Sequence, residues 1–420
     1  MIMAMIRPET EMKDSGVKYI GLIPRTWKIV QLKYCTDCLD GKRVPIDASL
    51  RKSGIYPYWG AGRIMDYVDD YIFDERLVLL GEDGAPFFDD FRPVSHLIDG
   101  KVWVNNHIHV LRTKDNVVDS YLVHALNSVD YHEYINGSIL NKLTQSNMNR
   151  IKIPLPSYIE QQAIADYLDE TCSKIDEIIA EAKASIDEYK ELKQSVIDKA
   201  VLHGLCNGMM KDSGNDLIGK IPLSWEMRKL KYVADFNPGI TTAYDAQKEV
   251  GYVPMNCVKN GYMNPLSARL SDMSTGLTGF QDGDIVIAKV TPCFENGNIA
   301  VAENLEQGVA FGSSELFVIR THSINRRFML YYLQNSVFKN QCISTMTGTG
   351  GLKRVSGYFV NNAYITYPPE NEQQVIVNYL DEAVKNMDSL ISEKESLIND
   401  LEAYKKSLIY EVVTGKRKVV

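Results

Sequence analysis

The chain has 420 residues, of which 45% are hydrophobic and 24% are charged, and its formal net charge is −8. These values are ordinary for a soluble globular protein, and the length predicts two or more domains. No apolar run reaches the roughly 18 residues of a membrane span, which excludes a membrane-spanning chain. The segment 1–6 is too short for a signal peptide and precedes Pro8 and Glu9, so we expect a cytoplasmic protein without a membrane partner.

The negative charge is concentrated in two segments. Residues 158–204 contain 11 acidic and 5 basic side chains, and residues 370–420 contain 10 acidic and 7 basic ones. The rest of the chain is therefore close to neutral, at +1. A net charge of −8 argues at first against a nucleic-acid partner, but whole-chain charge is a weak guide when segments differ this much.

The same two segments are copies of each other. The first copy begins with Glu160-Gln161-Gln162 and the second with Glu372-Gln373-Gln374, at an offset of 212 residues. Apolar residues recur at heptad a and d positions, which predicts two coiled-coil helices of about 45 residues, each roughly 65 Å long. The predicted a and d residues are Ile164, Leu168, Ile175, Ile178, Ala182, Tyr189, Leu192 and Val196 in the first copy, and Ile376, Leu380, Ala383, Met387, Leu390, Leu397, Leu401, Tyr404 and Leu408 in the second. Because one such helix cannot bury its apolar stripe alone, we expect the two helices to pack on each other.

The repeat extends beyond the helices. An Ile-Pro-x-x-Trp motif ends at Trp27 and again at Trp225, an offset of 198 residues. A weaker similarity, at offset 208, relates residues 77–80 to 285–288. Self-similarity of this kind predicts that both halves of the chain have the same fold.

A β-rich domain is predicted between each Trp and the following long helix, because apolar residues alternate there between Gly, Asn and Asp turns. The expected strands lie around 76–81, 101–112, 284–290, 298–302 and 315–320, and the expected short helices at 119–129 and 325–340. Ser157 and Glu160 fit a capping box at the start of the first long helix. The predicted fold class is α+β, with two β-rich domains separated by two long helices packed as an antiparallel coiled coil, in a pseudo-two-fold internal repeat.

This repeat divides the chain into four segments. Residues 1–156 and 210–369 each contain an Ile-Pro-x-x-Trp segment and a β-domain, and residues 157–209 and 370–420 each contain a long helix. The helices agree between the copies, whereas the β-domains differ strongly. A fixed scaffold that carries two divergent polar surfaces is what a bipartite recognition protein needs.

The chain resembles the specificity (S) subunit of type I restriction-modification systems. The resemblance covers nearly the whole chain and rests on the order of several motifs, each weak alone. These are the two Ile-Pro-x-x-Trp segments, the stretches 280–285 and 289–292, the Pro-containing stretches 153–156 and 367–369, and the two Glu-Gln-Gln helices. The resemblance implies that two target-recognition domains each read one half of a split, asymmetric DNA site. It also implies that the helices space these domains and dock methyltransferase (M) subunits.

The resemblance further implies a non-catalytic subunit of a methyltransferase and endonuclease complex. Its expected partners are double-stranded DNA, two M subunits and two restriction (R) subunits. S-adenosylmethionine, Mg and ATP are expected only in those partner subunits, and no cofactor is expected in this chain. The sequence contains no Gly-x-x-x-x-Gly-Lys-Ser/Thr phosphate loop. The alternative is a coiled-coil adaptor with two protein-interaction domains and no nucleic acid.

The candidate DNA contacts are polar side chains of the two β-domains, because such groups meet phosphates and base edges. In the first domain they are Tyr58, Trp59, Arg63, Asn105, Asn106, His107, His109, Lys142, Gln145, Ser146 and Asn149. In the second domain they are Lys259, Asn260, Lys289, Thr291, Asn296, Asn298, Ser313, Ser314, Thr347, Lys353 and Arg354. The alternative for each residue is a structural role in a turn, a cap or the core. Lys353 and Arg354 follow a Gly-rich loop, and we expect both to bind phosphates.

A metal site is not expected. His107 and His109 project from one face of a predicted strand, but their counterparts Glu315 and Phe317 cannot both be ligands, and no third ligand is evident. One Cys-x-x-Cys, at residues 35–38, lacks the second pair that a zinc site needs.

The acidic helices are predicted to bind the protein partner. Glu177 and Glu181 lie on the first long helix, which is too acidic to favour DNA. We therefore predict that these two carboxylates contribute to the binding of an M subunit.

Overall fold

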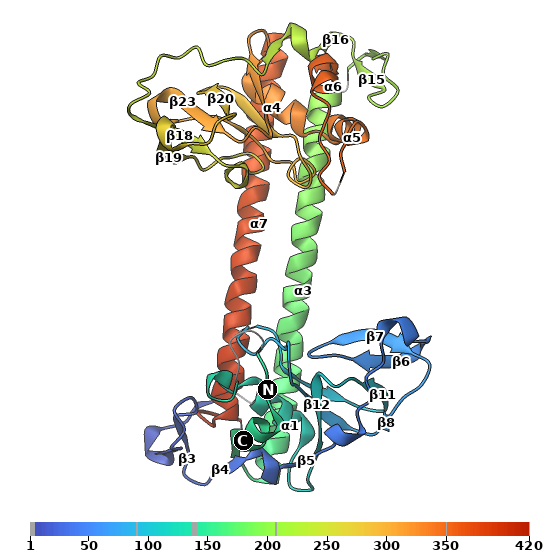
Figure 1. Ribbon diagram of the computed structural model, residues 1–420, viewed down its shortest axis with the longest axis vertical. Coiled ribbons are helices and arrows are strands. Elements are labelled where there is room, and N and C mark those ends of the chain that lie inside the picture. Colours follow the sequence, from blue (N-terminus) through green and yellow to red (C-terminus); the bar gives the residue numbers. More distant parts are fainter. Residues whose placement is uncertain (1–4, 90, 136–140, 206–207, 350, 420) are drawn as a thin grey trace. The chain divides into compact units, whose positions relative to one another are not determined.

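The computed structural model describes residues 5–89, 91–135, 141–205, 208–349 and 351–419. Contacts between residues divide the chain into two units. Unit 1 comprises Met1–Ala184 and Lys394–Val420, and unit 2 comprises Ser185–Glu393. Each unit contains one β-domain and a section of each long helix, α3 (Tyr158–His203) and α7 (Glu370–Val413) (Figure 1).

The β-domain of unit 1 consists of two four-stranded sheets, in the orders β10-β9-β12-β5 and β7-β6-β11-β8. The strands are β5 (Thr36–Cys38), β6 (Ser53–Trp59), β7 (Ile64–Val68), β8 (Phe73–Asp74), β9 (Leu77–Gly81), β10 (Ser95–Ile98), β11 (Lys101–Val104) and β12 (Ile108–Thr113). Strand β9 is buried along its whole length, as its continuous apolar run requires. The short helix α1 (Asp119–Asn127) packs on β9 and β10.

The β-domain of unit 2 has the same topology, with sheets in the orders β17-β24-β21-β22 and β19-β18-β23-β20. The strands are β17 (Ala234–Phe236), β18 (Glu249–Val253), β19 (Leu266–Arg269), β20 (Thr278–Gln281), β21 (Ile285–Ala288), β22 (Ile299–Val301), β23 (Val309–Gly312) and β24 (Leu316–Thr321). In both domains one central pair is parallel, β6 with β11 and β18 with β23, and the other pairs are antiparallel. The repeat seen in the sequence is thus a repeat of one α+β fold.

Short two-stranded ladders connect each β-domain to its neighbouring segments. In unit 1 they are β1 (Met5–Ile6) with β26 (Arg417–Lys418), β2 (Met12–Asp14) with β3 (Leu22–Pro24), and β4 (Lys28–Gln31) with β13 (Lys152–Leu155). In unit 2 they are β14 (Met210–Asp212) with β15 (Lys220–Pro222), and β16 (Glu226–Lys229) with β25 (Tyr364–Tyr367).

The Ile-Pro-x-x-Trp and Glu-Gln-Gln motifs meet in each unit. The indole N–H of Trp27 donates to the carboxylate of Glu160 at 3.2 Å, and that of Trp225 donates to Glu372 at 2.7 Å. Both indoles are buried, so each needs such an acceptor. The two motifs therefore recur together because each Trp fixes the first turn of a long helix.

The middle residue of each Glu-Gln-Gln motif is also buried. The side-chain oxygen of Gln161 accepts from the backbone N–H of Val118 at 3.0 Å, and that of Gln373 accepts from Asn325 at 2.7 Å. Each donor lies just before a short helix, so the motif also ties the long helix to the β-domain.

Of the 17 predicted a and d residues, 12 are buried or half-buried and five are exposed. Residues 168, 175, 182 and 189 in α3, and 380, 387, 401 and 408 in α7, are buried or half-buried as predicted. The second position of each heptad is shifted by one residue, because the inward residues are 172, 179 and 186 in α3 and 384, 391 and 398 in α7. The predicted core residues Ile178, Leu192, Leu390, Leu397 and Tyr404 are 39–51% exposed. In Ile178-Ile179 and Leu390-Ile391 two apolar residues adjoin, and the pattern alone does not show which one points inward.

Two predicted elements are each divided in two. Residues 101–112 form β11 and β12 with a turn between them, and residues 325–340 fall in α4 (Arg326–Gln334) and α5 (Ser336–Ser344). Asn335 separates the two helices because its side chain caps α5, accepting from the N–H of Phe338 at 2.8 Å. The short helices α2 (Gln145–Arg150) and α6 (Gly357–Asn362) were not predicted.

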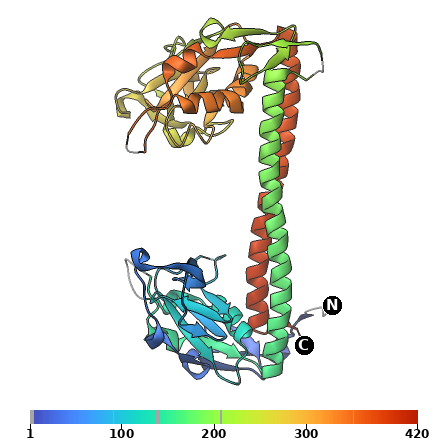
Figure 2. The ribbon, with the colours of Figure 1, turned by 90° about the vertical axis from the view of Figure 1, so that its right-hand side faces the viewer.

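The C-terminal ends of the two long helices are equivalent. Gly204 follows α3 with φ +77°, and Gly415 follows α7 with φ +73°, the left-handed conformation that ends many helices. A Cβ at Gly415 would lie 2.5 Å from the ring of Pro24 and 2.9 Å from Trp27, and one at Gly204 would lie 3.1 Å from Trp225. The last turn of α7 thus packs on the first Ile-Pro-x-x-Trp segment, and β1 pairs with β26 beside it (Figure 2). Within the described ranges, no helix is both long and apolar enough to cross a membrane.

Candidate nucleic-acid interface

Three segments of unit 1 meet at one edge of its β-domain: the turn after β9 (82–84), the β11–β12 turn (105–107) and the segment leading into α2 (141–146). We call this edge the first rim. The corresponding segments of unit 2 are 289–291, 313–315, 346–349 and 351–354, and we call them the second rim.

The backbones of the two rims are hydrogen-bonded alike. The N–H of Glu82 donates to the carbonyl of His107 at 3.0 Å, and the N–H of Lys289 donates to the carbonyl of Glu315 at 2.9 Å. The carbonyls of Glu82 and Lys289 accept in turn from the segments before α2 and α6, at 2.7 and 2.9 Å. These bonds align Glu82 with Lys289 and His107 with Glu315, so an acid of the first rim corresponds to a lysine of the second on a common backbone frame.

The first rim combines two carboxylates with one lysine and one histidine. Lys142 lies 3.1 Å from Glu82 and 3.6 Å from Asp83, and the hydrogen bond to Glu82 raises the pKa of Lys142. The imidazole of His107 pairs with Asp83. Asn105 turns its side chain back to accept from the N–H of His107 at 2.8 Å, so it shapes the turn. The charged groups of this rim are therefore largely compensated by one another.

The second rim has an excess of positive charge. Arg354 donates to Glu315 through Nε at 2.9 Å and Nη2 at 2.8 Å, and this pairing lowers the pKa of Glu315 and raises that of Arg354. Lys289 Nζ donates to the carbonyl of Ser314 at 2.6 Å. Lys353 is exposed and forms no ion pair with any residue that the structure describes.

Thr291 holds the Gly-rich loop of the second rim in place. Its half-buried hydroxyl donates to the carbonyl of Gly351 at 3.0 Å and accepts from the N–H of Lys353 at 3.0 Å. The N–H of Thr291 donates to the carbonyl of Lys353 at 2.9 Å. Thr291 therefore fixes the backbone from which Lys353 projects.

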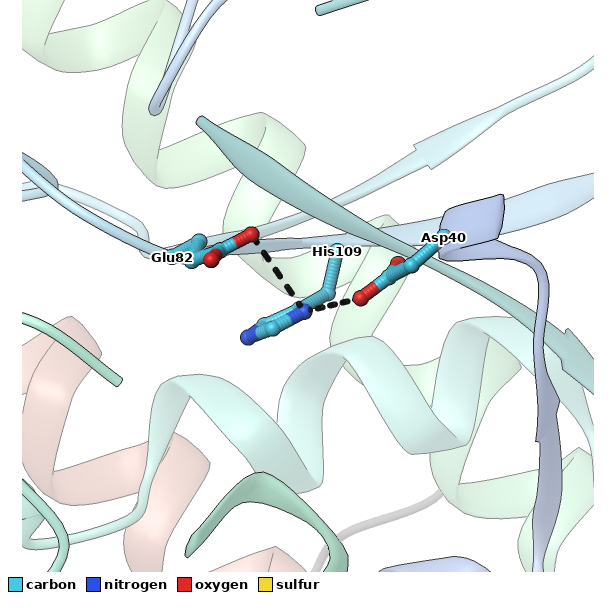
Figure 3. Close-up of side chains that lie close together, drawn as sticks. All are labelled: Asp40, Glu82 and His109. Carbon is cyan, nitrogen blue, oxygen red and sulfur yellow. Dashed lines mark hydrogen bonds and ion pairs between the residues drawn. The ribbon is translucent and has the colours of Figure 1, made fainter. Parts of the chain in front are cut away.

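Four charged side chains lie together beneath the first rim: Asp40, Arg43, Glu82 and His109. His109 is 1% exposed, and its Nδ1 lies 2.6 Å from Asp40 and 3.8 Å from Glu82 (Figure 3). Arg43 donates to Glu82 at 2.6 Å and lies 3.4 Å from Asp40. Burial alone would raise the pKa of Asp40, but the hydrogen bond from His109 and the nearby Arg43 hold that pKa below its usual value. We call these four residues the ionic network.

The ionic network includes three possible metal ligands, since one ligand atom from each of Asp40, Glu82 and His109 lies within 4.8 Å of the others. However, His109 Nε2 lies 2.8 Å from the carbonyl of Leu143, which only accepts, so Nε2 carries a proton. Nδ1 faces the carboxylate of Asp40, so both ring nitrogens are already engaged. Arg43 and His109 already occupy the two carboxylates, and the arrangement favours a hydrogen-bonded cluster over a metal site.

The same place in unit 2 is apolar. Phe317 stands where unit 1 has His109, and its ring lies 5.0 Å from that of Phe236. The N–H of Val318 donates to the side chain of Asn237 at 2.9 Å, just as the N–H of Val110 donates to Asp40 at 2.9 Å. One backbone contact is thus conserved between the units, while the charged group around it is replaced by an aromatic pair.

The structure brings most of the predicted DNA contacts onto the two rims. Those on the rims are Asn105, Asn106, His107, Lys142, Gln145, Ser146, Lys289, Thr291, Ser313, Ser314, Thr347, Lys353 and Arg354. Gln145 is exposed, and its amide donates to the sulfur of Cys38 at 3.1 Å. Asn149 lies half-buried on α2 behind the first rim.

Two predicted contacts are corrected by their burial. Tyr58 is fully buried, with its hydroxyl 3.1 Å from the backbone N–H of Ile46, so it is a core residue. His109 belongs to the ionic network and supports the first rim from beneath. Trp59 is half-buried against the ring of His96, at 5.1 Å, and Arg63 is exposed in the β6–β7 turn.

Four predicted contacts of unit 2 lie away from the second rim. Asn260, Asn296 and Asn298 line a cavity of about 330 Å³ beside α3, α4 and α7. Lys259 precedes them and is exposed. Gln334 donates to the side chain of Asn260 at 2.9 Å, so Asn260 has a side-chain partner within unit 2.

Sequence reasoning missed Asp40, Arg43 and Glu82. Arg43 and Asp40 lie in a turn about 40 residues before Glu82 along the chain, and a charged residue in a turn predicts only a solvated surface. The buried histidine was the available signal, because a buried imidazole needs polar partners. Its partners become visible only once β5, β9 and β12 are seen to be neighbours.

Glu177 and Glu181 are exposed on α3, within unit 1. The residues wrongly predicted to be core are also exposed there and in unit 2. Ile178 and Leu390 occupy the same position in the two helix copies, as do Leu192 and Tyr404, at the 212-residue offset. Both long helices therefore present apolar side chains beside acidic ones.

Comparison with known proteins identifies the family. Residues 24–188 and 222–400 match the type I restriction modification DNA specificity domain, and the chain belongs to that family. It is 35% identical over 183 residues to the type I restriction enzyme EcoAI specificity subunit and 32% identical over 234 residues to the EcoEI specificity subunit, both from Escherichia coli. These matches cover 42% and 54% of this chain but 31% and 37% of those proteins, so the chain spans about a third of the length of these curated relatives.

The fold is also found in a solved structure. A chain from a study of complex assembly and conformational transition of the type I R-M system superposes with a TM-score of 0.67 at 16% identity. The superposition covers 94% of this chain and 99% of the other. At this identity the likeness concerns the fold alone. The family and the relatives are named for specificity, and these descriptions indicate no catalytic domain.

Proposed function

We propose that this chain is the DNA sequence-recognition subunit of a type I restriction-modification complex, and that each rim reads one half of a split, asymmetric DNA site. The observation that carries the proposal is the pair of rims, which share one hydrogen-bonded backbone frame and differ in almost every side chain. A shared frame presents both rims to DNA in the same way. Different side chains then select different bases.

The side chains on the rims have the chemistry of base and phosphate recognition. Asn106, Gln145 and Ser146 are exposed on the first rim, and amide side chains suit adenine edges. Lys353 and Ser314 are exposed on the second rim, where lysine suits a phosphate or a guanine edge. We propose that the first rim discriminates mainly through amides and hydroxyls and the second through cations.

The long helices are proposed to pack as an antiparallel coiled coil that spaces the two domains. Heptad burial in α3 and α7 supports this proposal, as do ion pairs between them within each unit. In unit 1, Asp176 pairs with Lys405 at 2.6 Å and Lys183 lies 3.9 Å from Glu402. Residue numbers therefore increase along α3 as those of its partners on α7 decrease, which is the pattern of antiparallel helices. In unit 2, Lys193 pairs with Asp388 at 2.6 Å.

The outer faces of these helices are proposed to dock two M subunits, one on each helix copy, and two R subunits are proposed to complete the complex. Apolar residues that recur at matched exposed positions, as Ile178 and Leu390 do, suit helices of a protein partner better than DNA. Glu177 and Glu181 are proposed to contribute charge to that contact. The chain itself is proposed to be non-catalytic and without cofactor, with S-adenosylmethionine, Mg and ATP bound only by its partners.

The test is co-expression of the chain with its M subunit in a host without other DNA methyltransferases, followed by single-molecule sequencing of adenine methylation. We expect one split site whose two halves differ in sequence. An uninterrupted palindrome would contradict the assignment of different halves to the two rims. Methylation that is independent of this chain, in a complex that still assembles, would favour the adaptor alternative.

A further inference from the structure

Among the residues of unit 2 that the structure describes, Phe236 and Phe317 take the place of the ionic network of Asp40, Arg43, Glu82 and His109, and Lys289 Nζ lies 5.4 Å from the Phe317 ring. We infer that this network positions the first rim, so that Arg43 and His109 set the base preference of one half-site without touching DNA. The inference rests on the proposed function and assigns a positioning role within it.

The network contacts every segment of the first rim. Glu82 is itself part of the turn after β9. Arg43 donates to the carbonyl of Asn106 at 3.4 Å and to that of Ile108 at 2.8 Å, which fixes the β11–β12 turn. His109 donates to the carbonyl of Leu143 at 2.8 Å, beside Lys142. The three segments are far apart in the sequence, and these four side chains join them at their base.

Such a network controls geometry because its members are largely buried and hydrogen-bonded to one another and to the rim backbone. His109 is buried and both of its nitrogens are used, and Arg43 and Glu82 are 13% and 12% exposed. Removing one member leaves a buried charge or carbonyl unpaired, and the rim segments must then shift to regain water or another partner. Recognition of a base edge tolerates displacements of only about 0.5 Å.

Unit 2 supplies a matched control. Phe317 lies at the position of His109, at 6% exposure, and packs on Phe236 beneath the second rim. A substitution there disturbs the second rim through packing and does not affect the ionic network. A positioning role predicts that substitutions at these two positions affect opposite halves of the site.

The experiment compares His109→Leu and Phe317→Leu in the full chain, each co-expressed with the M subunit, by sequencing adenine methylation in host DNA. We expect His109→Leu to relax the bases of one half-site at least tenfold in relative methylation and to leave the other half unchanged. We expect Phe317→Leu to relax the opposite half. His109→Gln, whose amide nitrogen keeps a donor for the carbonyl of Leu143, is expected to restore part of the lost preference.

A second variant distinguishes a positioning role from misfolding of the domain. Arg43 contacts Glu82 and the two carbonyls through Nη1 and approaches Asp40 through Nη2. Arg43→Lys retains the positive charge but has a single nitrogen that cannot reach both sides, so it should relax the same half-site as His109→Leu. Hydrogen exchange measured on the same proteins should rise in residues 105–107 and 141–146, while β9 stays protected.

Three results would overturn the inference. The first is an unchanged base preference in both His109→Leu and Arg43→Lys. The second is a uniform loss of methylation with both halves still read correctly, which would show a merely structural role. The third is relaxation of the same half by His109→Leu and Phe317→Leu. If the wild-type chain directs no sequence-dependent methylation, the proposed function itself fails, and that failure is visible before any variant is compared.

Discussion

The two rims differ in charge although their backbones are the same. The first rim contains the acidic Glu82 and Asp83 and the basic Lys142. The second rim contains three basic residues, Lys289, Lys353 and Arg354, and one acidic residue, Glu315. The frame depends on main-chain hydrogen bonds and on buried strands, so the exposed side chains are free to vary. The exposed side chains of the two copies can therefore diverge without a change of fold.

The rims also differ in what supports them. Charged groups hold the first rim from beneath, and an aromatic pair holds the second. Buried ion pairs are sensitive to the removal of one partner, whereas apolar contacts lose stability gradually as volume is removed. We therefore expect the two units to respond differently to substitution, to acid and to salt.

The largest difference is expected when one cation is removed from each unit. Arg43→Met should lower the free energy of unfolding by about 3 kcal/mol, because Glu82 and Asp40 then lose one of their ionic partners and the carbonyl of Ile108 loses its donor. Arg354→Met should change stability little, because its ion pair with Glu315 lies at the surface. Urea unfolding followed by circular dichroism measures both. Equal destabilisation by the two variants would contradict the contrast between the supports.

A comparable effect is expected on the two helix copies. Ile178→Glu and Leu390→Glu change residues that occupy matched positions, 45% and 39% exposed. Each should cost about 2 kcal/mol of M-subunit binding, the value of one buried aliphatic side chain. Titration calorimetry with the M subunit should show one of two binding events weakened by each variant.

The charged residues beside this apolar stripe provide a second variant. Glu177→Lys combined with Glu181→Lys should weaken the same binding event as Ile178→Glu, and Glu181→Gln alone should do so only slightly. Unchanged binding by all of these variants would place the M-subunit contact elsewhere.

The sequence predicted the repeat, the α+β class and the long helices, because each depends on a local pattern or on direct similarity between the copies. It did not predict which of two adjacent apolar residues faces inward, as at Ile178 and Ile179, because that choice depends on the partner helix. Most of the residues that it proposed as DNA contacts lie on the rims, but Tyr58 and His109 are buried. The ionic network could not be predicted from the sequence, because its members are brought together only by the pairing of β12 with both β5 and β9.

A smaller difference is expected in acid. The pKa of Asp40 lies below its usual value in the folded chain, since the bonds from His109 and Arg43 outweigh its burial. The stability contributed by its ionisation is therefore fully present above pH of about 4 and is lost as the pH falls through the lower folded value. Asp40→Asn should destabilise the chain at pH 7, by about 1 kcal/mol or more. The gap between wild type and variant should narrow as the pH falls below 4. A gap that is constant from pH 7 to pH 3 would show that the charge of Asp40 is not what stabilises unit 1.

The smallest expected difference between the rims is in how each contributes to the salt dependence of DNA binding. Lys353 is exposed and has no ion-pair partner among the described residues, so its charge is available to a phosphate. Arg354 is already paired with Glu315, and Lys142 with Glu82, so neither should release a full counterion on binding. The sequence predicts two phosphate contacts, from Lys353 and Arg354, whereas the geometry favours one.

Lys353→Ala should reduce the slope of log affinity against log salt by about 0.9, or about 3.5-fold in affinity between 50 and 200 mM salt. Lys142→Ala should leave that slope unchanged. Both variants are titrated with the cognate duplex in the reconstituted complex at several salt concentrations. If Lys142→Ala lowers the slope as much as Lys353→Ala does, both rims meet the DNA backbone through free cations, and the charge contrast between them has no part in binding.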